Sequence, residues 1–73
     1  MSRAAVIGEP ARTAGFALAG ALVFPAASAE QAHEAWSLLP ADVAVLVLTP
    51  GAAGWLGALP RARRDVLLVV MPP

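Results

Sequence analysis

Two short runs made only of apolar side chains limit the possible folds of this chain more than any other feature. They cover residues 43–48 (VAVLVL) and residues 66–71 (VLLVVM). Neither run alternates apolar with polar residues, and a strand that is apolar throughout is typical of a parallel sheet covered on both faces. Because parallel strands need long crossover connections, which are usually helical, the two runs predict an α/β fold.

The rest of the chain supplies the other elements in strict alternation. Strands are predicted at residues 4–7 and 22–24, and helices at residues 11–19, between Ser28 and Pro40, and at residues 51–59. With right-handed crossovers, this alternation predicts a small doubly wound parallel sheet, Rossmann-like or flavodoxin-like. By analogy with small doubly wound folds, we expect its four strands in the order 2-1-3-4. At 73 residues the chain is long enough for a single domain, residues 1–73.

Local signals indicate where the second and third helices begin. Ser28 is a natural N-cap, and Gln31 follows three residues later, as in a capping box. Thr49 followed by Pro50 is typical of a capped helix start. After Ser28, four residues recur at helical spacing and form one apolar stripe that we expect in the core: Ala32, Ala35, Trp36 and Leu39.

Composition limits how far such a domain can stabilise itself. Alanine accounts for 18 residues, each burying only about one methyl group, so large apolar side chains are few. A core of this size rarely supplies more than roughly 3–5 kcal/mol without a disulfide or a metal, and the chain has no cysteine. The sequence therefore predicts a thinly covered sheet that completes its burial on another protein.

Charge excludes one class of partner. Five arginines balance five carboxylates, so the net charge is zero and the basic stripe that nucleic acid requires is lacking. The only basic cluster comprises Arg61, Arg63 and Arg64, just before the last strand. We interpret it either as a solvated loop or as a contact for an acidic surface on a partner.

Two membrane-related interpretations compete with the globular one. Residues 14–24 are apolar and residues 27–29 (ASA) resemble a cleavage site, so residues 1–29 have features of a secretory signal, although Glu9 and Pro10 interrupt its basic region. Residues 43–60 carry no charge, but Pro50 and three glycines interrupt a stretch at the lower limit for a spanning helix. We favour a protein without direct membrane insertion.

Few residues offer catalytic or ligand-binding chemistry. His33 is the only histidine and falls on the polar side of its helix, so the chain predicts neither a catalytic set nor a metal site. Gly8 follows the first strand, but the dinucleotide fingerprint needs further glycines there, and the P-loop needs a lysine that the chain lacks. Trp55, on a glycine-rich helix, is a better candidate for an interface anchor than Trp36.

Two short motifs open the chain: residues 5–9 (AVIGE) and, after a polar turn, residues 15–20 (GFALAG). Together they resemble the opening of the small central-stalk subunit of V-type and archaeal-type ATP synthases, which are rotary ATPases. The valine-rich run that ends at Thr49 and the last strand, which ends at Pro72, are similar to later landmarks of that family. Family members also carry a helix after the last strand, so this sequence resembles a member shortened at its C-terminus.

The resemblance implies a non-catalytic rotor protein without active site, cofactor or metal. Members of the family bind the coiled-coil protein that forms the shaft of the stalk, in the cytoplasmic head of the complex and peripheral to the membrane. They help to couple ATP hydrolysis or synthesis to proton or sodium transport. The implied partners are this coiled-coil stalk protein and other components of the rotary ATPase. From their places in the predicted fold, we expect these residues at the interface: Trp55, Leu56, Arg61, Arg63, Arg64, Val70 and Met71.

A second hypothesis comes from a different functional class. Open α/β sheets bind ligands in the crevice beyond the carboxyl ends of their strands. In this chain that crevice would lie beyond Gly8 and Thr49. The alternative function is therefore an orphan α/β domain that binds a nucleotide or a phosphorylated metabolite there.

Overall fold

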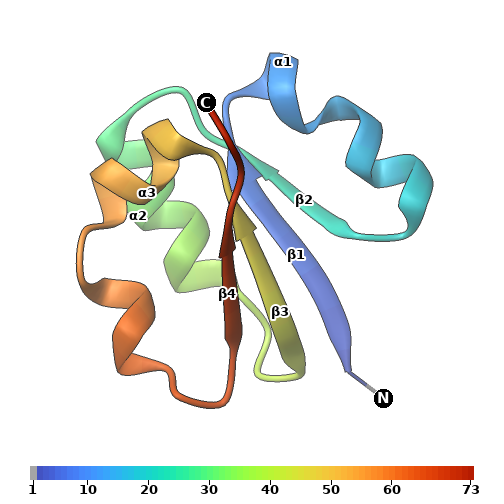
Figure 1. The fold of residues 1–73 in the computed structure, drawn as a ribbon, viewed down its shortest axis with the longest axis vertical. Helices are drawn as coiled ribbons and strands as arrows, with labels where there is room; N and C mark the ends of the chain where they lie inside the picture. The colour runs from blue at the N-terminus through green and yellow to red at the C-terminus, as the bar shows by residue number, and fades with distance from the viewer. Residues whose placement is uncertain (1) are drawn as a thin grey trace.

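Four parallel strands form one sheet in the order β2-β1-β3-β4 in the computed structural model, which describes residues 2–73 (Figure 1). The strands are β1 (Arg3–Gly8), β2 (Leu22–Pro25), β3 (Val43–Leu48) and β4 (Leu67–Val70). The predicted fold class, parallel arrangement and strand order are confirmed. The bounds of β3 are those predicted, and the other three strands differ from the prediction by one residue at an end or at both ends.

The helices divide unequally between the two faces of the sheet. Helices α2 (Ala29–Leu38) and α3 (Pro50–Leu56) pack on one face, whereas α1 (Pro10–Thr13) and the 3-10 helix η1 (Ala14–Ala19) lie beside β2 and β1 (Figure 1). Right-handed crossovers produce this division, because β2 lies on one side of β1 while β3 and β4 lie on the other. We refer to the two faces as the α2/α3 face and the α1 face.

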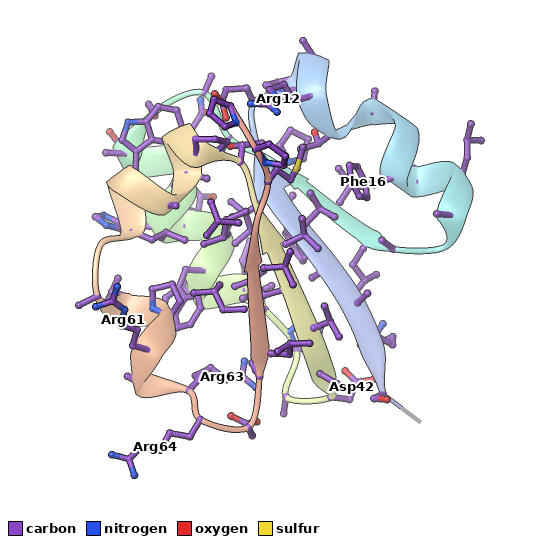
Figure 2. All side chains as sticks on the ribbon, viewed as in Figure 1. Arg12, Phe16, Asp42, Arg61, Arg63 and Arg64 are labelled. Carbon is purple, nitrogen blue, oxygen red and sulfur yellow. The ribbon has the colours of Figure 1, made fainter. Side chains whose placement is uncertain are left out.

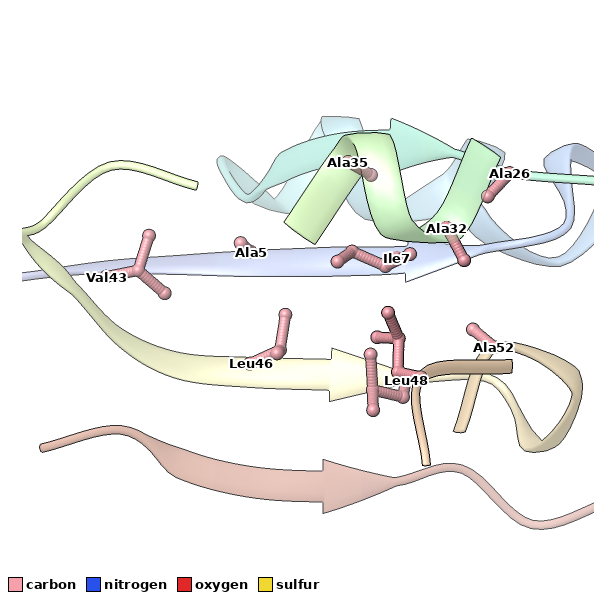
Figure 3. Close-up of a cluster of buried hydrophobic side chains, with 10 residues drawn as sticks. Ala5, Ile7, Ala26, Ala32, Ala35, Val43, Leu46, Leu48 and Ala52 are labelled. Carbon is pink, nitrogen blue, oxygen red and sulfur yellow. The ribbon is translucent and has the colours of Figure 1, made fainter. Parts of the chain in front are cut away.

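The main core lies between the sheet and the helices α2 and α3. Ala32 and Ala35 are buried against β1, and their short side chains let the helix approach the strands closely (Figure 3). Trp36 and Leu39 pack at the edge of the same cluster, so the predicted apolar stripe is confirmed. The buried cluster as a whole comprises Ala5, Ile7, Ala26, Ala32, Ala35, Val43, Leu46, Leu48, Ala52 and Leu56.

The predicted helix starts are confirmed by their hydrogen bonds. The Gln31 backbone N–H donates to Ser28 Oγ at 3.2 Å, and Gln31 Oε1 accepts from the Ala27 backbone N–H at 2.7 Å. The bond to Ser28 satisfies an N–H group that the first helical turn leaves unpaired. The reciprocal bond differs from a standard capping box by one residue, because its donor is Ala27 and not the N-cap residue. Thr49 caps α3 in the same way, with its Oγ1 accepting from the Ala52 N–H at 3.2 Å.

The first predicted helix is only partly α-helical. Its α-helical part ends at Thr13, whose hydroxyl donates back to the Glu9 carbonyl, and the segment continues as 3-10 turns to Ala19. The η1 segment has no buried residue and contains Gly15, so little packing energy holds it in the α form. Gly20 ends it with a left-handed φ of 84°, as its glycine predicts.

The third helix also ends earlier than predicted. It stops at Leu56 because Gly57 follows with a φ of +58° and turns the chain away. Part of the segment expected as a loop forms a second 3-10 helix, η2 (Leu59–Ala62), which buries Pro60. Among residues 2–73, no helix is long and apolar enough to cross a membrane.

Candidate partner-binding surface

The crevice at the carboxyl ends of the strands is filled by the chain itself. The Thr49 side chain is fully buried, and a Cβ placed on Gly8 would lie only 2.2 Å from Thr49 Cγ2. Thr49 Oγ1 also donates to Glu9 Oε1. Gly8, Glu9 and Thr49 therefore close the point between β1 and β3 where open α/β sheets bind ligands.

Glu9 also occupies the position that an anionic ligand would take at the start of α3. A Cβ placed on Gly51, in the first turn of that helix, would lie 2.8 Å from Glu9 Oε2. The hydrogen bond from Thr49 lowers the pKa of the Glu9 carboxyl below its usual range, with Arg12 adding a smaller effect of the same sign. A negative charge is favourable at a helix N-terminus, so the chain's own carboxylate serves here where a phosphate would otherwise bind.

The α1 face of the sheet is covered over only half its width. Under α1, Val6 and Thr13 are fully buried. Side chains alternate along a strand, so β3 and β4 each direct every second residue to this same face beyond α1. Four apolar side chains there form what we call the open face: Val45, Val47, Leu67 and Val69.

Exposure of the open face increases toward the sheet edge. Val45 and Val47 on the central strand are half-buried, whereas Leu67 is 64% exposed and Val69 41% exposed on the edge strand. On the opposite face Leu46 and Leu48 of the same β3 are buried by α2 and α3. The apolar run of β3 predicts burial on both faces, and only its α2/α3 face is fully buried.

The interface residues expected from the sequence do not form one surface. Leu56 is 3% exposed inside the core, so it has no surface to offer a partner. Trp55 is half-buried against that core, and its carbonyl accepts a hydrogen bond from His33 Nε2 at 3.0 Å. Val70 is half exposed and Met71 half-buried at the end of β4, at the opposite end of the strand from the arginines.

The arginine cluster precedes β4, with Arg61 on η2 and with Arg63 and Arg64 in the segment that leads into the strand (Figure 2). Arg61 and Arg64 are exposed, whereas Arg63 binds Asp65 at 3.1 Å and reaches the Ala41 carbonyl at 3.5 Å. The Arg63 guanidinium lowers the pKa of Asp65. Arg63 is thus tied to the chain itself, and Arg61 and Arg64 remain available to solvent or to a partner.

The sequence predicts a thinly covered sheet but does not identify which residues form the open face. Val45, Val47 and Leu67 lie within the apolar runs, where no polar neighbour marks which face each residue takes. The predicted strand order already contains the missing signal. In the order 2-1-3-4 only one connection crosses the α1 face, so alternate residues of the third and fourth strands must lie uncovered there.

Two other kinds of site find little support in the structure. A shallow groove of about 220 Å³ runs between β2 and α2, lined by Val23, Phe24, Pro25, Gln31, Glu34, Ala35 and Leu38. Its one ionisable group is Glu34, which gives it no convergent set of polar groups. Within residues 2–73, no three His, Cys, Asp or Glu side chains gather as metal ligands would.

Comparison of the chain with models of protein families, with curated proteins and with solved structures finds no match.

Proposed function

We propose that this protein is a non-catalytic binding module whose open face receives a helix of a partner protein. The proposal depends on the half-covered sheet: α1 and η1 cover the α1 face over β1 and β2, and Val45, Val47, Leu67 and Val69 continue that face without cover. Contiguous exposed apolar surface on a small domain usually marks a partner site.

The dimensions of the open face suit one helix. Adjacent strands lie about 4.8 Å apart, so the β3–β4 half of the sheet is roughly as wide as a helix with its side chains, about 10–12 Å. A helix seated there would complete the three-layer arrangement that the fold has on its β1–β2 side. No charged side chain is among the four residues of the open face, so an apolar stripe on the partner helix is the expected complement.

We further propose that the partner is the coiled-coil shaft of the central stalk in a V-type or archaeal-type rotary ATPase. Support comes from the resemblance of residues 5–9 and 15–20 to the opening of the small central-stalk protein of these complexes. In the structure these residues form the end of β1 with its turn, and η1 with Gly20. In that role the protein would couple ATP hydrolysis or synthesis to ion transport through the rotor, without an active site of its own.

The filled crevice weighs against the alternative of a nucleotide or phosphorylated metabolite. A phosphate at the start of α3 would have to displace the Glu9 carboxylate and break its hydrogen bond with Thr49. Because like charges repel, the Glu9 carboxylate opposes the binding of an anionic ligand at the start of α3.

Binding of the purified coiled-coil shaft protein, measured by isothermal titration calorimetry, tests the proposal. Leu67→Arg places a charge in the open face and should weaken binding about tenfold or more, since charge at an apolar interface core is strongly unfavourable. Leu18→Arg is the matched control, because Leu18 is 94% exposed on η1 and lies outside the open face. Equal affinity of both variants, or no affinity of the unaltered protein for the shaft, would contradict the proposal.

A further inference from the structure

The two edges of the sheet differ in what their backbones offer. In β2 the hydrogen bond from the Ala26 N–H to the Gly8 carbonyl means that the backbone N–H and carbonyl of every second residue point toward β1. The backbone groups of Val23 and Pro25 therefore point away from the sheet. Proline has no N–H, so this edge offers a single donor within the strand. A second strand could therefore receive only one N–H from this edge.

The β4 edge is open by the same reasoning. The Met71 N–H donates to the Leu48 carbonyl at 2.8 Å, so the backbone N–H and carbonyl groups of Val69 and Met71 point toward β3. Those of Leu68 and Val70 point away from the sheet. Both outward residues carry an N–H and a carbonyl, and no charge, proline or bulge protects the strand between Leu67 and Val70. Natural proteins usually blunt such an edge.

We propose that the β4 edge binds the β4 edge of a second copy of this chain, antiparallel and centred on Val69. With Val69 opposite its own counterpart, Leu68 of each copy faces Val70 of the other. Each such pair exchanges two N–H···O bonds, so four hydrogen bonds form about one two-fold axis. This pairing uses the backbone edge and does not depend on the proposed partner of the open face.

One pair of opposite charges lies at the two ends of β4. Asp65 precedes the strand, and its side chain is 65% exposed despite the contact with Arg63. Arg12 lies at the other end, where its Nη2 donates to the Pro72 carbonyl at 2.8 Å (Figure 2). Antiparallel pairing brings Asp65 of each copy to the Arg12 end of the other, and the exposed Arg64 beside Asp65 comes to the same end. The net charge of zero adds no overall repulsion between the copies.

Single-cysteine variants of the full chain test the register directly, because the natural chain has no cysteine. In Val69→Cys the two thiols would face each other in a non-hydrogen-bonded pair, with Cα atoms about 4.5 Å apart, within the range for a disulfide. Leu67→Cys is the matched control on the same strand and face. Its counterpart would lie four residues along the partner strand, at least about 13 Å away.

We expect Val69→Cys to form a disulfide-linked dimer under mild oxidation and Leu67→Cys to remain monomeric on a non-reducing gel. Equal cross-linking of both variants, or of neither, would overturn the proposed pairing. In the latter case a free β4 edge would be left for a peptide of another protein.

Sedimentation equilibrium over a range of concentrations supplies a second test without cross-linking. The unaltered protein should approach twice its 7.4 kDa monomer mass as its concentration rises. Val70→Pro removes one outward donor and should abolish this increase, while Val70→Ala, which keeps the donor, should preserve it. A dimer that persists in Val70→Pro would contradict the inference, and the cysteine variants decide the question if Val70→Pro does not fold.

Discussion

The side chain of Thr49 occupies the space that any side chain at position 8 would need. A Cβ on Gly8 would lie 2.2 Å from Thr49 Cγ2 and 2.9 Å from Thr49 Cβ, and neither atom is the free end of a flexible side chain. The close approach of β1 to the start of α3 therefore depends on glycine, and it draws the carboxyl ends of the two central strands together.

Gly8→Ala should destabilise the protein by about 1–3 kcal/mol or more, as overpacking in a closed interior does. For so small a domain this is a large part of the total stability. Gly15→Ala is the matched control, since nothing lies within 4 Å of its added Cβ and its φ is not positive. It should be neutral or stabilising by about 0.4–1 kcal/mol. Urea unfolding measures the free energy of unfolding of both variants, and equal changes would contradict the close packing of Gly8 against Thr49.

The Thr49 hydroxyl has two partners, and its removal should be costly. Thr49→Val keeps the shape but leaves the buried Ala52 N–H without its acceptor, so we expect a loss of about 1–3 kcal/mol. Thr49→Ser keeps the hydroxyl and should retain more of that stability, losing mainly the packing of one methyl group. Thermal unfolding of the three proteins checks the order, and a valine variant as stable as the natural protein would contradict the capping role.

Stability should depend on pH through the Glu9–Thr49 hydrogen bond. The folded-state pKa of Glu9 is lowered, so its contribution is present above the ordinary glutamate pKa of about 4.3 and is lost as the pH falls through the lowered value. The pKa values of Asp42, beside Arg3, and of Asp65, beside Arg63, are shifted in the same direction and add to this acid sensitivity.

Glu9→Gln should therefore melt at a lower temperature than the natural protein at pH 7, and the gap should narrow as the pH falls below about 4. Melting temperatures recorded from pH 7 to pH 3 give the comparison. Glu34→Gln, at an exposed carboxylate of α2, is the control and should follow the natural protein throughout. A gap for Glu9→Gln that stays constant with pH would show that ionisation of this carboxyl is not involved.

Much of the fold is predictable because its strongest signals are local and agree with one another. The apolar run of β3, the cap and proline at Thr49 and Pro50, and the stripe of α2 each predict one element. Right-handed crossovers then predict a parallel sheet, and the analogy with small doubly wound folds supplies the strand order. The first helix is predicted less well. The helix propensity of its alanines favours the α form along the whole segment. Residues 14–19 bury no side chain, however, so no tertiary packing maintains that form there.

The candidate surface is less predictable for a related reason. Leu56 and Trp55 are neighbours on one short helix, and the sequence does not reveal that one is sealed in the core while the other lies at its margin. Likewise, Val47 and Leu48 look equivalent in an apolar run, although they take opposite faces of the sheet. Those assignments depend on which helices cover which face, and therefore on the assembled fold.

The docking of a helix on the open face can be observed residue by residue through methyl resonances of valine, leucine and isoleucine, recorded while the unlabelled coiled-coil shaft protein is added. We expect Val45, Val47, Leu67 and Val69 to shift or broaden as the partner helix covers them, while Ile7 and Leu46, buried on the other side of the sheet, keep their positions. Perturbations confined to the α2/α3 face, or none at a stoichiometric amount of the shaft protein, would contradict the proposed function.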